Sequence, residues 1–265
     1  MTSSVSIQDK IVDSVKQGNF SAEWRDITYQ HDGHVIDVSF MSDALIVPEF
    51  GRVNVTCKTQ QRLADLFNAS LLTPFLADIL WQNANLKLRP ETQTISSSVE
   101  AGKVHSQRID SQISKHQNKD QKNRLVGNAG KHWCLTNQLK AGSVICVNYG
   151  MFVFAQESRW DNSLNHIAWR GIKVYKPKHS NSQEFYVIQE PATAHDITHV
   201  DYSQTCQLVS QFVKIDGVEY RLSDVLVHDQ LGNCFTNTGP LKFSRHPMVP
   251  KDNKLTVFFP VTIEA

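Results

Sequence analysis

The chain has 265 residues, of which 40% are hydrophobic, so it can bury a substantial apolar core within one domain. Its 27 Lys and Arg residues nearly balance its 26 Asp and Glu residues, and the isoelectric point is about 7.7. Such a balance gives no global field of the kind that holds nucleic acid or an anionic membrane, and we expect no nucleic-acid partner. No apolar run approaches the roughly 20 residues that cross a bilayer, so we expect no membrane span.

The N-terminal segment lacks the basic region and the continuous apolar region of a signal peptide. We therefore expect a cytoplasmic protein, or one exported by a route that does not use a signal peptide. The five cysteines are odd in number and widely spaced, which favours neither a disulfide framework nor a structural zinc site. The segment 127–131 resembles a phosphate-binding loop but lacks its full glycine spacing, and we expect no cofactor.

Residues 1–90 are expected to form a helix-rich lobe. Apolar residues at helical spacing predict a first helix, which Ser6 caps and Gly18 ends. Short antiparallel strands are expected next, over 36–40, 44–47 and 53–57.

Two successive helices are predicted after these strands. Thr59 is the expected cap of the first, and Thr73 caps the second with Pro74 at its first helical position. The following segment, 91–130, is too polar over much of its length to form core, so we expect a polar flap or linker containing a helix over about 101–117.

Residues 131–265 are expected to form a strand-rich lobe. The dipeptide Asp216-Gly217 between two β-rich runs predicts a hairpin, and a helical turn is expected over 223–226. The predicted strands cover 133–136, 143–149, 152–154, 172–175, 185–189, 206–215, 218–222 and 255–263. We therefore expect one α+β domain over 1–265, with a mainly antiparallel sheet against which the helical N-terminal part packs.

The densest set of chemically capable side chains lies over 189–204, which we expect to be a loop between two strands. It contains His195, Asp201, Tyr202 and Ser203. Functional groups concentrate on loops that rigid strands hold, so position and composition both favour a site here.

The expected catalytic residues are His195, Asp201 and Ser203. An imidazole can take and give a proton near neutral pH, and a carboxylate that accepts a hydrogen bond from it sets its tautomer. Ser203 would be a nucleophile or substrate contact. The alternative is structural, with Asp201 and Ser203 stabilising a turn through hydrogen bonds to the backbone.

Two other chemistries are weaker on this sequence. A metal site at His195, His199 and Asp201 matches no zinc signature in its spacing, and we expect no metal ion. A cysteine nucleophile at Cys134 or Cys206 would lie inside an expected strand, where buried inert thiols are more common.

Several segments resemble a bacterial protein family of uncharacterised activity that is associated with cell-wall functions. The resemblance spans about 5–240 and rests on two patterns, Leu-x-Thr-Pro at 71–74 and the run from His195 to Ser203, together with the segments 61–65, 78–81, 135–137 and 147–150. It implies one undivided α+β unit. The chain departs from the family where Met151-Phe152 replaces Trp-His and where His199 replaces Tyr.

The residues and the resemblance together give the expected substrate contacts, which are Tyr202, His105, Lys131, Asn137 and Tyr149. We expect a hydrolase that acts on a cell-envelope peptide or polysaccharide, with a small molecule or cell-wall fragment as its substrate. The alternative is a non-catalytic module that binds a ligand or a protein partner. A catalytic site requires His195 and Asp201 within hydrogen-bonding distance in a concave pocket.

Overall fold

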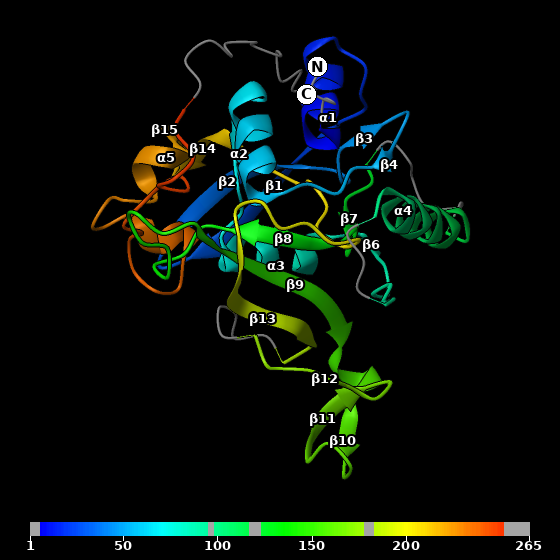
Figure 1. Cartoon of the computed structure of the whole chain (residues 1–265). Helices are drawn as coiled ribbons and strands as arrows, with labels where there is room; N and C mark the ends of the chain where they lie inside the picture. The colour runs from blue at the N-terminus through cyan, green and yellow to red at the C-terminus, as the bar shows by residue number, and fades with distance from the viewer. Residues whose placement is uncertain (1–5, 95–97, 117–122, 178–182, 252–265) are drawn as a thin grey trace.

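The computed structural model describes residues 6–94, 98–116, 123–177 and 183–251. Within these ranges the chain is an α+β fold with mostly antiparallel strands, and the N-terminal helices pack against sheet (Figure 1). The fold class expected from the sequence is therefore confirmed. The strand predicted over 255–263 lies outside the described residues.

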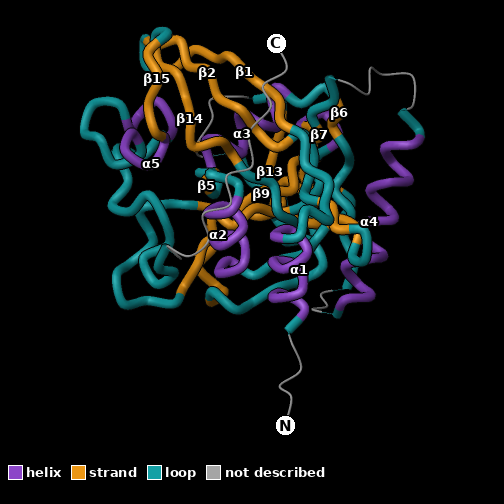
Figure 2. Tube along the Cα trace, turned by 90° about the horizontal axis from the view of Figure 1, so that it is seen from above, coloured by secondary structure: helices purple, strands orange, loops and turns teal. Residues whose placement is uncertain are grey.

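The largest sheet joins the beginning of the chain to its C-terminal part. Its main strands lie in the order β1 (Trp24–His31), β2 (His34–Met41), β14 (Val209–Ile215) and β15 (Val218–Arg221), and β5 (Ala69–Ser70) also pairs with β14. Figure 2 shows these four main strands side by side. Asp216 and Gly217 both have positive φ, of 51° and 81°, so the predicted hairpin turn is confirmed.

A second sheet carries the candidate catalytic histidine. Its strands lie in the order β13 (Phe185–Asp196), β9 (Ile145–Phe154) and β8 (Lys131–Cys134). The sequence predicted a break in β9 at Gly150, but positive φ values at Gly150 and Met151 let one strand continue through it. The predicted loop over 189–204 was also wrong in its first part, because β13 continues to Asp196 with register shifts around Pro191.

A small three-stranded sheet projects from the body below β9 and β13 (Figure 1). It consists of β10 (Arg159–Asp161), β11 (His166–Trp169) and β12 (Ile172–Lys173). Trp169 and Val174 anchor it by packing with Val153, while Trp160 remains 59% exposed.

The first three helices pack into the core, and two of their three N-caps match the sequence prediction. The helices are α1 (Ile7–Lys16), α2 (Cys57–Leu66) and α3 (Pro74–Asn83). Ser6 caps α1 and Thr73 caps α3 as predicted. For α2 the prediction of Thr59 was wrong, because the Thr56 hydroxyl accepts from the backbone N–H of Thr59 and the helix begins at Cys57.

Part of the segment 91–130 is buried in the protein, whereas a polar flap or linker was predicted there. The predicted helix is confirmed as α4 (Val99–Ser114), which buries His105 and Ile109. Leu125, Val126 and Ala129 are buried as well, because β7 (Val126–Gly127) pairs in parallel with β6 (Leu86–Lys87). The flap assignment was therefore wrong for 123–130, while 117–122 lie outside the described residues.

The remaining elements of the described chain are short. They are β3 (Ile46–Val47), β4 (Gly51–Arg52), α5 (Leu222–Val225) and the 3₁₀ turns Ala155–Glu157 and Gly232–Phe235. The helical turn predicted near 223–226 is confirmed by α5. The predicted strand over 53–57 was wrong, because this stretch leads directly into α2.

One apolar cluster connects the two expected lobes. It includes Ile11, Phe40, Trp133, Val209 and Phe235, which come from distant parts of the chain. Among the described residues, no helix is both long enough and apolar enough to cross a membrane.

We expect Thr73→Ala to lower the free energy of unfolding by about 2 kcal/mol, because the hydroxyl makes two hydrogen bonds. Its oxygen accepts from the N–H of Leu76 at 3.1 Å, and its proton goes to the carbonyl of Phe235 at 2.6 Å. Urea unfolding measures the change. Thr73→Ser keeps both bonds and should lose much less, so equal losses in the two variants would contradict this role.

Candidate functional site

His195 lies near the end of β13, where it pairs with Cys146 of β9. Its ring stacks on His199 with centroids 3.8 Å apart, and it meets the Trp133 ring edge-on at 6.2 Å. Burial, followed by the nearby His199 and Lys131, lowers the pKa of His195, while Asp201 acts in the opposite direction. The imidazole is therefore neutral at neutral pH.

The predicted hydrogen bond from His195 to Asp201 is not formed among the described residues, because other groups occupy the carboxylate. Asp201 Oδ2 accepts from Lys131 Nζ at 2.8 Å, and Oδ1 accepts from the backbone N–H and the hydroxyl of Ser203, both at 2.8 Å. Burial alone would raise the pKa of Asp201, but Lys131 and Ser203 outweigh it and hold the pKa below its ordinary value. The carboxylate is thus charged and paired.

Ser203 is placed as a structural partner of Asp201. Its side chain is fully buried, and its hydroxyl donates to the weakly basic Asp201 carboxylate rather than to a histidine. The Lys131 ammonium is held by the same carboxylate and is almost as deeply buried. This geometry disfavours Ser203 as a nucleophile and matches the structural alternative considered for the turn.

His105 and Tyr202 come together beside Asp201. Their ring centroids are 5.5 Å apart, and the Tyr202 hydroxyl accepts from the backbone N–H of Gln93 at 3.1 Å. Burial, helped by the charge of Arg52, lowers the pKa of His105 to about 4, so this ring is neutral. Its Nδ1 has no partner among the described residues.

Asn137 and Tyr149, two other expected substrate contacts, make structural bonds elsewhere. Asn137 binds the chain near Pro240, with Nδ2 donating to the carbonyl of Pro240 at 3.1 Å and Oδ1 accepting from the N–H of Lys242 at 2.9 Å. Tyr149 is fully buried and donates to Asp78 Oδ1 at 2.7 Å. Six of the eight expected site residues therefore gather near Asp201, and these two do not.

The thiols and the potential metal ligands offer no further reactive centre in the described part. All five cysteines are free and buried. Burial raises the pKa of both Cys134 and Cys206, which keeps these thiols protonated. No group of three or more His, Cys, Asp or Glu side chains among the described residues is arranged to hold a metal ion.

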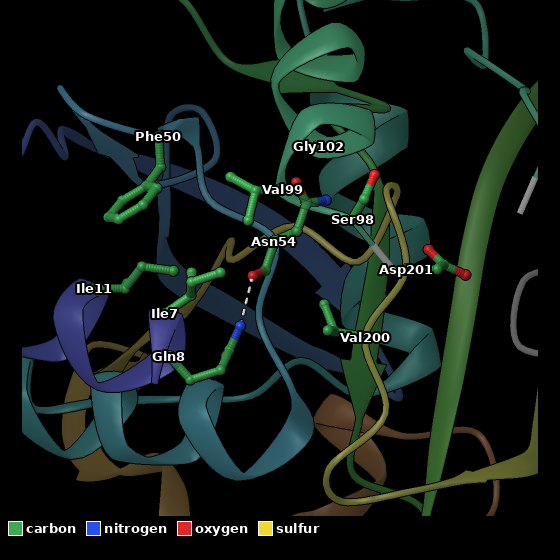
Figure 3. Close-up of a pocket in the computed structure, with 10 residues that line it drawn as sticks. All are labelled: Ile7, Gln8, Ile11, Phe50, Asn54, Ser98, Val99, Gly102, Val200 and Asp201. Carbon is green, nitrogen blue, oxygen red and sulfur yellow. Dashed lines mark hydrogen bonds between the residues drawn. The ribbon is translucent and has the colours of Figure 1, made fainter. Parts of the chain in front are cut away.

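A pocket of about 180 Å³ opens on one side of Asp201 (Figure 3). Residues from α1, α4 and three loop segments line it: Ile7, Gln8, Ile11, Phe50, Asn54, Ser98, Val99, Gly102, Val200 and Asp201. Figure 3 shows Ile7, Ile11 and Phe50 on one side and Ser98 and Asp201 on the other. Neither His195 nor His199 lines this pocket. Of the predicted catalytic pair, Asp201 lines it and His195 does not.

Gln8 and Asn54 each donate one of their two side-chain N–H protons to a backbone carbonyl of the protein. Gln8 Nε2 donates to the carbonyl of Asn54 at 3.1 Å, and Gln8 Oε1 accepts from the N–H of Thr56 at 3.0 Å. Asn54 Nδ2 donates to the carbonyl of Tyr202, whereas Asn54 Oδ1 has no protein donor in the described part of the chain. Asp201 has received three hydrogen bonds of the roughly four that a carboxylate accepts. Asn54 Oδ1 and the Asp201 carboxylate can therefore each still accept a hydrogen bond.

Gly102 permits the close approach of α4 to Asn54. A Cβ at this position would lie 2.5 Å from Asn54 Oδ1, so any larger residue would displace that amide. Neither Asn54 nor Gly102 is predicted as a site residue from the sequence. Asn54 begins an Asn-x-Thr triplet, which does not indicate a pocket, and no local signal indicates that a glycine inside a helix faces one.

No protein-family model matches the chain, and no curated protein or solved structure is significantly similar to it. The resemblance to a family associated with the cell wall therefore stays a prediction, and the site has to be interpreted from its own geometry.

Proposed function

We propose that this chain is a ligand-binding protein whose pocket beside Asp201 takes a small neutral molecule with an apolar body and a hydroxyl group. The observation that carries the proposal is the pairing of apolar walls with two side-chain oxygens that can still accept a hydrogen bond. The walls come from Ile7, Ile11 and Phe50, and the free acceptors are on Asn54 and Asp201. Concave, mostly apolar sites with a few placed polar atoms are typical of ligand pockets.

The charges around the pocket favour a neutral donor over an ion. The charge of Asp201 is matched by Lys131 at 2.8 Å, so no unbalanced negative charge is left for a cation. An anionic ligand would lose part of its water beside the charged Asp201 carboxylate, which costs free energy. A hydroxyl group supplies one proton to an acceptor without adding charge.

The volume sets the size of the ligand. An apolar cavity of about 150 Å³ is large enough to bind benzene, so a pocket of about 180 Å³ accommodates one ring or a branched chain of similar bulk. A larger molecule would place only one such group inside. A side chain or terminal group of a cell-envelope fragment would meet this requirement.

Benzyl alcohol tests the proposal as a minimal ligand. We expect it to bind with a Kd of about 1 mM, measured by calorimetry or ligand-observed NMR. Benzyl methyl ether has a similar shape but no hydroxyl proton, and it should bind about fivefold more weakly because one hydrogen bond is lost. Val99→Trp places an indole in the pocket from its half-buried rim and should weaken benzyl alcohol binding by about tenfold or more.

Two control variants make this test specific. Gln17→Trp adds an indole at an exposed position outside the pocket, and His195→Ala removes the predicted catalytic group without touching the lining. Both should bind benzyl alcohol as the parent protein does. Equal affinity for the alcohol and the ether, or unchanged binding by Val99→Trp, would contradict the proposal.

A second candidate function is hydrolysis of a cell-envelope peptide or polysaccharide with His195 as general base. It is favoured by one observation, the neutral and only partly buried imidazole whose pKa is affected by Asp201. In this candidate a water molecule is the nucleophile, because the Ser203 hydroxyl is buried and bound. His195→Ala separates the two functions. It would abolish the hydrolysis of cell-wall fragments while leaving benzyl alcohol binding intact.

A further inference from the structure

A second pocket, of about 220 Å³, lies away from Asp201. Four segments that are distant in the sequence form it: the start of α3, the turn after β8, the bulge of β13 at Pro191, and the loop over 236–241. It shares no lining residue with the pocket beside Asp201. The two sites can therefore be tested independently.

The lining of this second pocket is polar but uncharged. Hydroxyl and amide side chains alternate with apolar ones, and none of the described residues that line it is Asp, Glu, Lys, Arg or His. The polar members include Thr136, Gln138 and Asn237, and the apolar members include Phe75, Leu135 and Leu241. This mixture suits a neutral ligand that carries both polar groups and an apolar surface.

Hydrogen bonds from the lining residues hold the pocket open. The Asn137 side chain binds the backbone of Pro240 and Lys242, as described above. Thr236 donates to the carbonyl of Gly239 at 2.6 Å, and Thr73 donates to the carbonyl of Phe235 at 2.6 Å. Because these bonds connect the loop to α3 and to the turn after β8, the cavity is preformed and a ligand need not order it.

The lining also includes a backbone N–H at the start of α3 that has no acceptor in the described part of the chain. Pro74 has no N–H, and the Leu76 and Ala77 amides donate to the side chain and carbonyl of Thr73. The Phe75 N–H is left with no acceptor among the described residues. It is suited to a ligand carbonyl, while the exposed Gln138 amide on the rim can bond to hydroxyl groups.

We propose that this second pocket binds a neutral molecule bearing an acetamido group and hydroxyl groups, of the size of a single sugar ring. The carbonyl of the acetamido group accepts from the Phe75 N–H, and its methyl group packs on the apolar wall. A charged group has no counterpart in the lining. The site is separate from the function proposed above and does not depend on it.

N-acetylglucosamine is the probe that tests this site, with glucose as the matched sugar that lacks the acetamido group. We expect saturable binding of N-acetylglucosamine in the millimolar range, about tenfold tighter than binding of glucose, by NMR titration. Thr238→Trp introduces an indole from the exposed rim and should weaken this binding by about tenfold or more. Val99→Trp should leave it unchanged, just as Thr238→Trp should leave benzyl alcohol binding unchanged.

Three results would overturn this proposal. They are the absence of saturable N-acetylglucosamine binding, equal binding of glucose, and competition by inorganic phosphate, which would identify an anion site at the start of α3 instead. If Thr238→Trp does not fold, as judged by circular dichroism, Gln138→Trp fills the same rim from another exposed position. Unchanged binding by the folded variant would also reject the site.

Discussion

Replacing Asp78 by asparagine should stabilise the protein by about 2–4 kcal/mol at pH 7. Asp78 is fully buried in α3, and among the described residues its hydrogen-bond partner is the Tyr149 hydroxyl, which donates to Oδ1 at 2.7 Å. Burial raises the pKa of Asp78 to about 8, against the lowering effect of that hydrogen bond. The other oxygen, Oδ2, has no partner in the part of the chain that the structure describes.

The effect of Asp78 on stability depends on pH with a definite sign. The unfolded chain releases this proton near pH 4, whereas the folded chain keeps it until about pH 8. The contribution of Asp78 to folding is therefore fully present below about pH 4 and is lost as the pH rises to about 8. Asparagine cannot ionise in either state and still accepts from Tyr149, so it avoids this loss.

Urea unfolding at several pH values between 4 and 8 measures the effect. The advantage of Asp78→Asn over the parent protein should be small near pH 4 and should grow steadily toward pH 8. Tyr149→Phe is the matched variant, because it removes the bond that stabilises the charged carboxylate and should extend the decline to pH values above 8. Parallel stability curves for Asp78→Asn and the parent would show that Asp78 does not hold its proton.

Asp201→Asn should destabilise the protein by about 3–5 kcal/mol, because it leaves the ammonium group of Lys131 buried without a countercharge. The Lys131 side chain is 11% exposed, and Asp201 Oδ2 is its partner at 2.8 Å. The hydrogen bonds from Ser203 can persist, since asparagine retains an acceptor oxygen in place of Oδ1. Had Asp201 been paired with His195, as the sequence predicts, the loss would be modest, because a neutral imidazole does not need a countercharge.

A double variant isolates the ion pair. Lys131→Met/Asp201→Asn removes both charges and should recover most of the stability that Asp201→Asn loses, because a buried pair costs much of its Coulombic gain in desolvation. Thermal or urea unfolding of the parent, the two single variants and the double variant completes the cycle. Additive losses would mean that Lys131 and Asp201 do not stabilise each other.

The sequence predicted those helix ends and turns that depend only on residues close by in the chain. Ser6 and Thr73 act as caps, and Asp216-Gly217 forms a hairpin turn, because each needs only its own short-range hydrogen bonds or backbone angles. The strand at 24–31 was missed although its partner was found. Its alternation is weak, and it becomes a strand by pairing with 34–41.

The candidate site was predictable in its composition but not in its bonding. His195, Asp201 and Ser203 drew attention as a dense polar run, yet the partner of Asp201 is Lys131, 70 positions earlier in the chain. Sequence proximity favoured His195, which β13 positions differently from the expected loop. The pocket lining was also hidden, because α1 and α4 meet there only through the tertiary fold.

The most direct test of the proposed function is to locate benzyl alcohol on the protein by NMR with methyl-labelled isoleucine and valine. The proposal predicts that the methyl signals of Ile7, Ile11 and Val99, which line the pocket beside Asp201, shift in a saturable way as the probe is added. The exposed Val218 lies outside this lining and should not shift. No shift at the three lining residues, or shifts confined to other methyl groups, would contradict the assignment of this pocket as the ligand site.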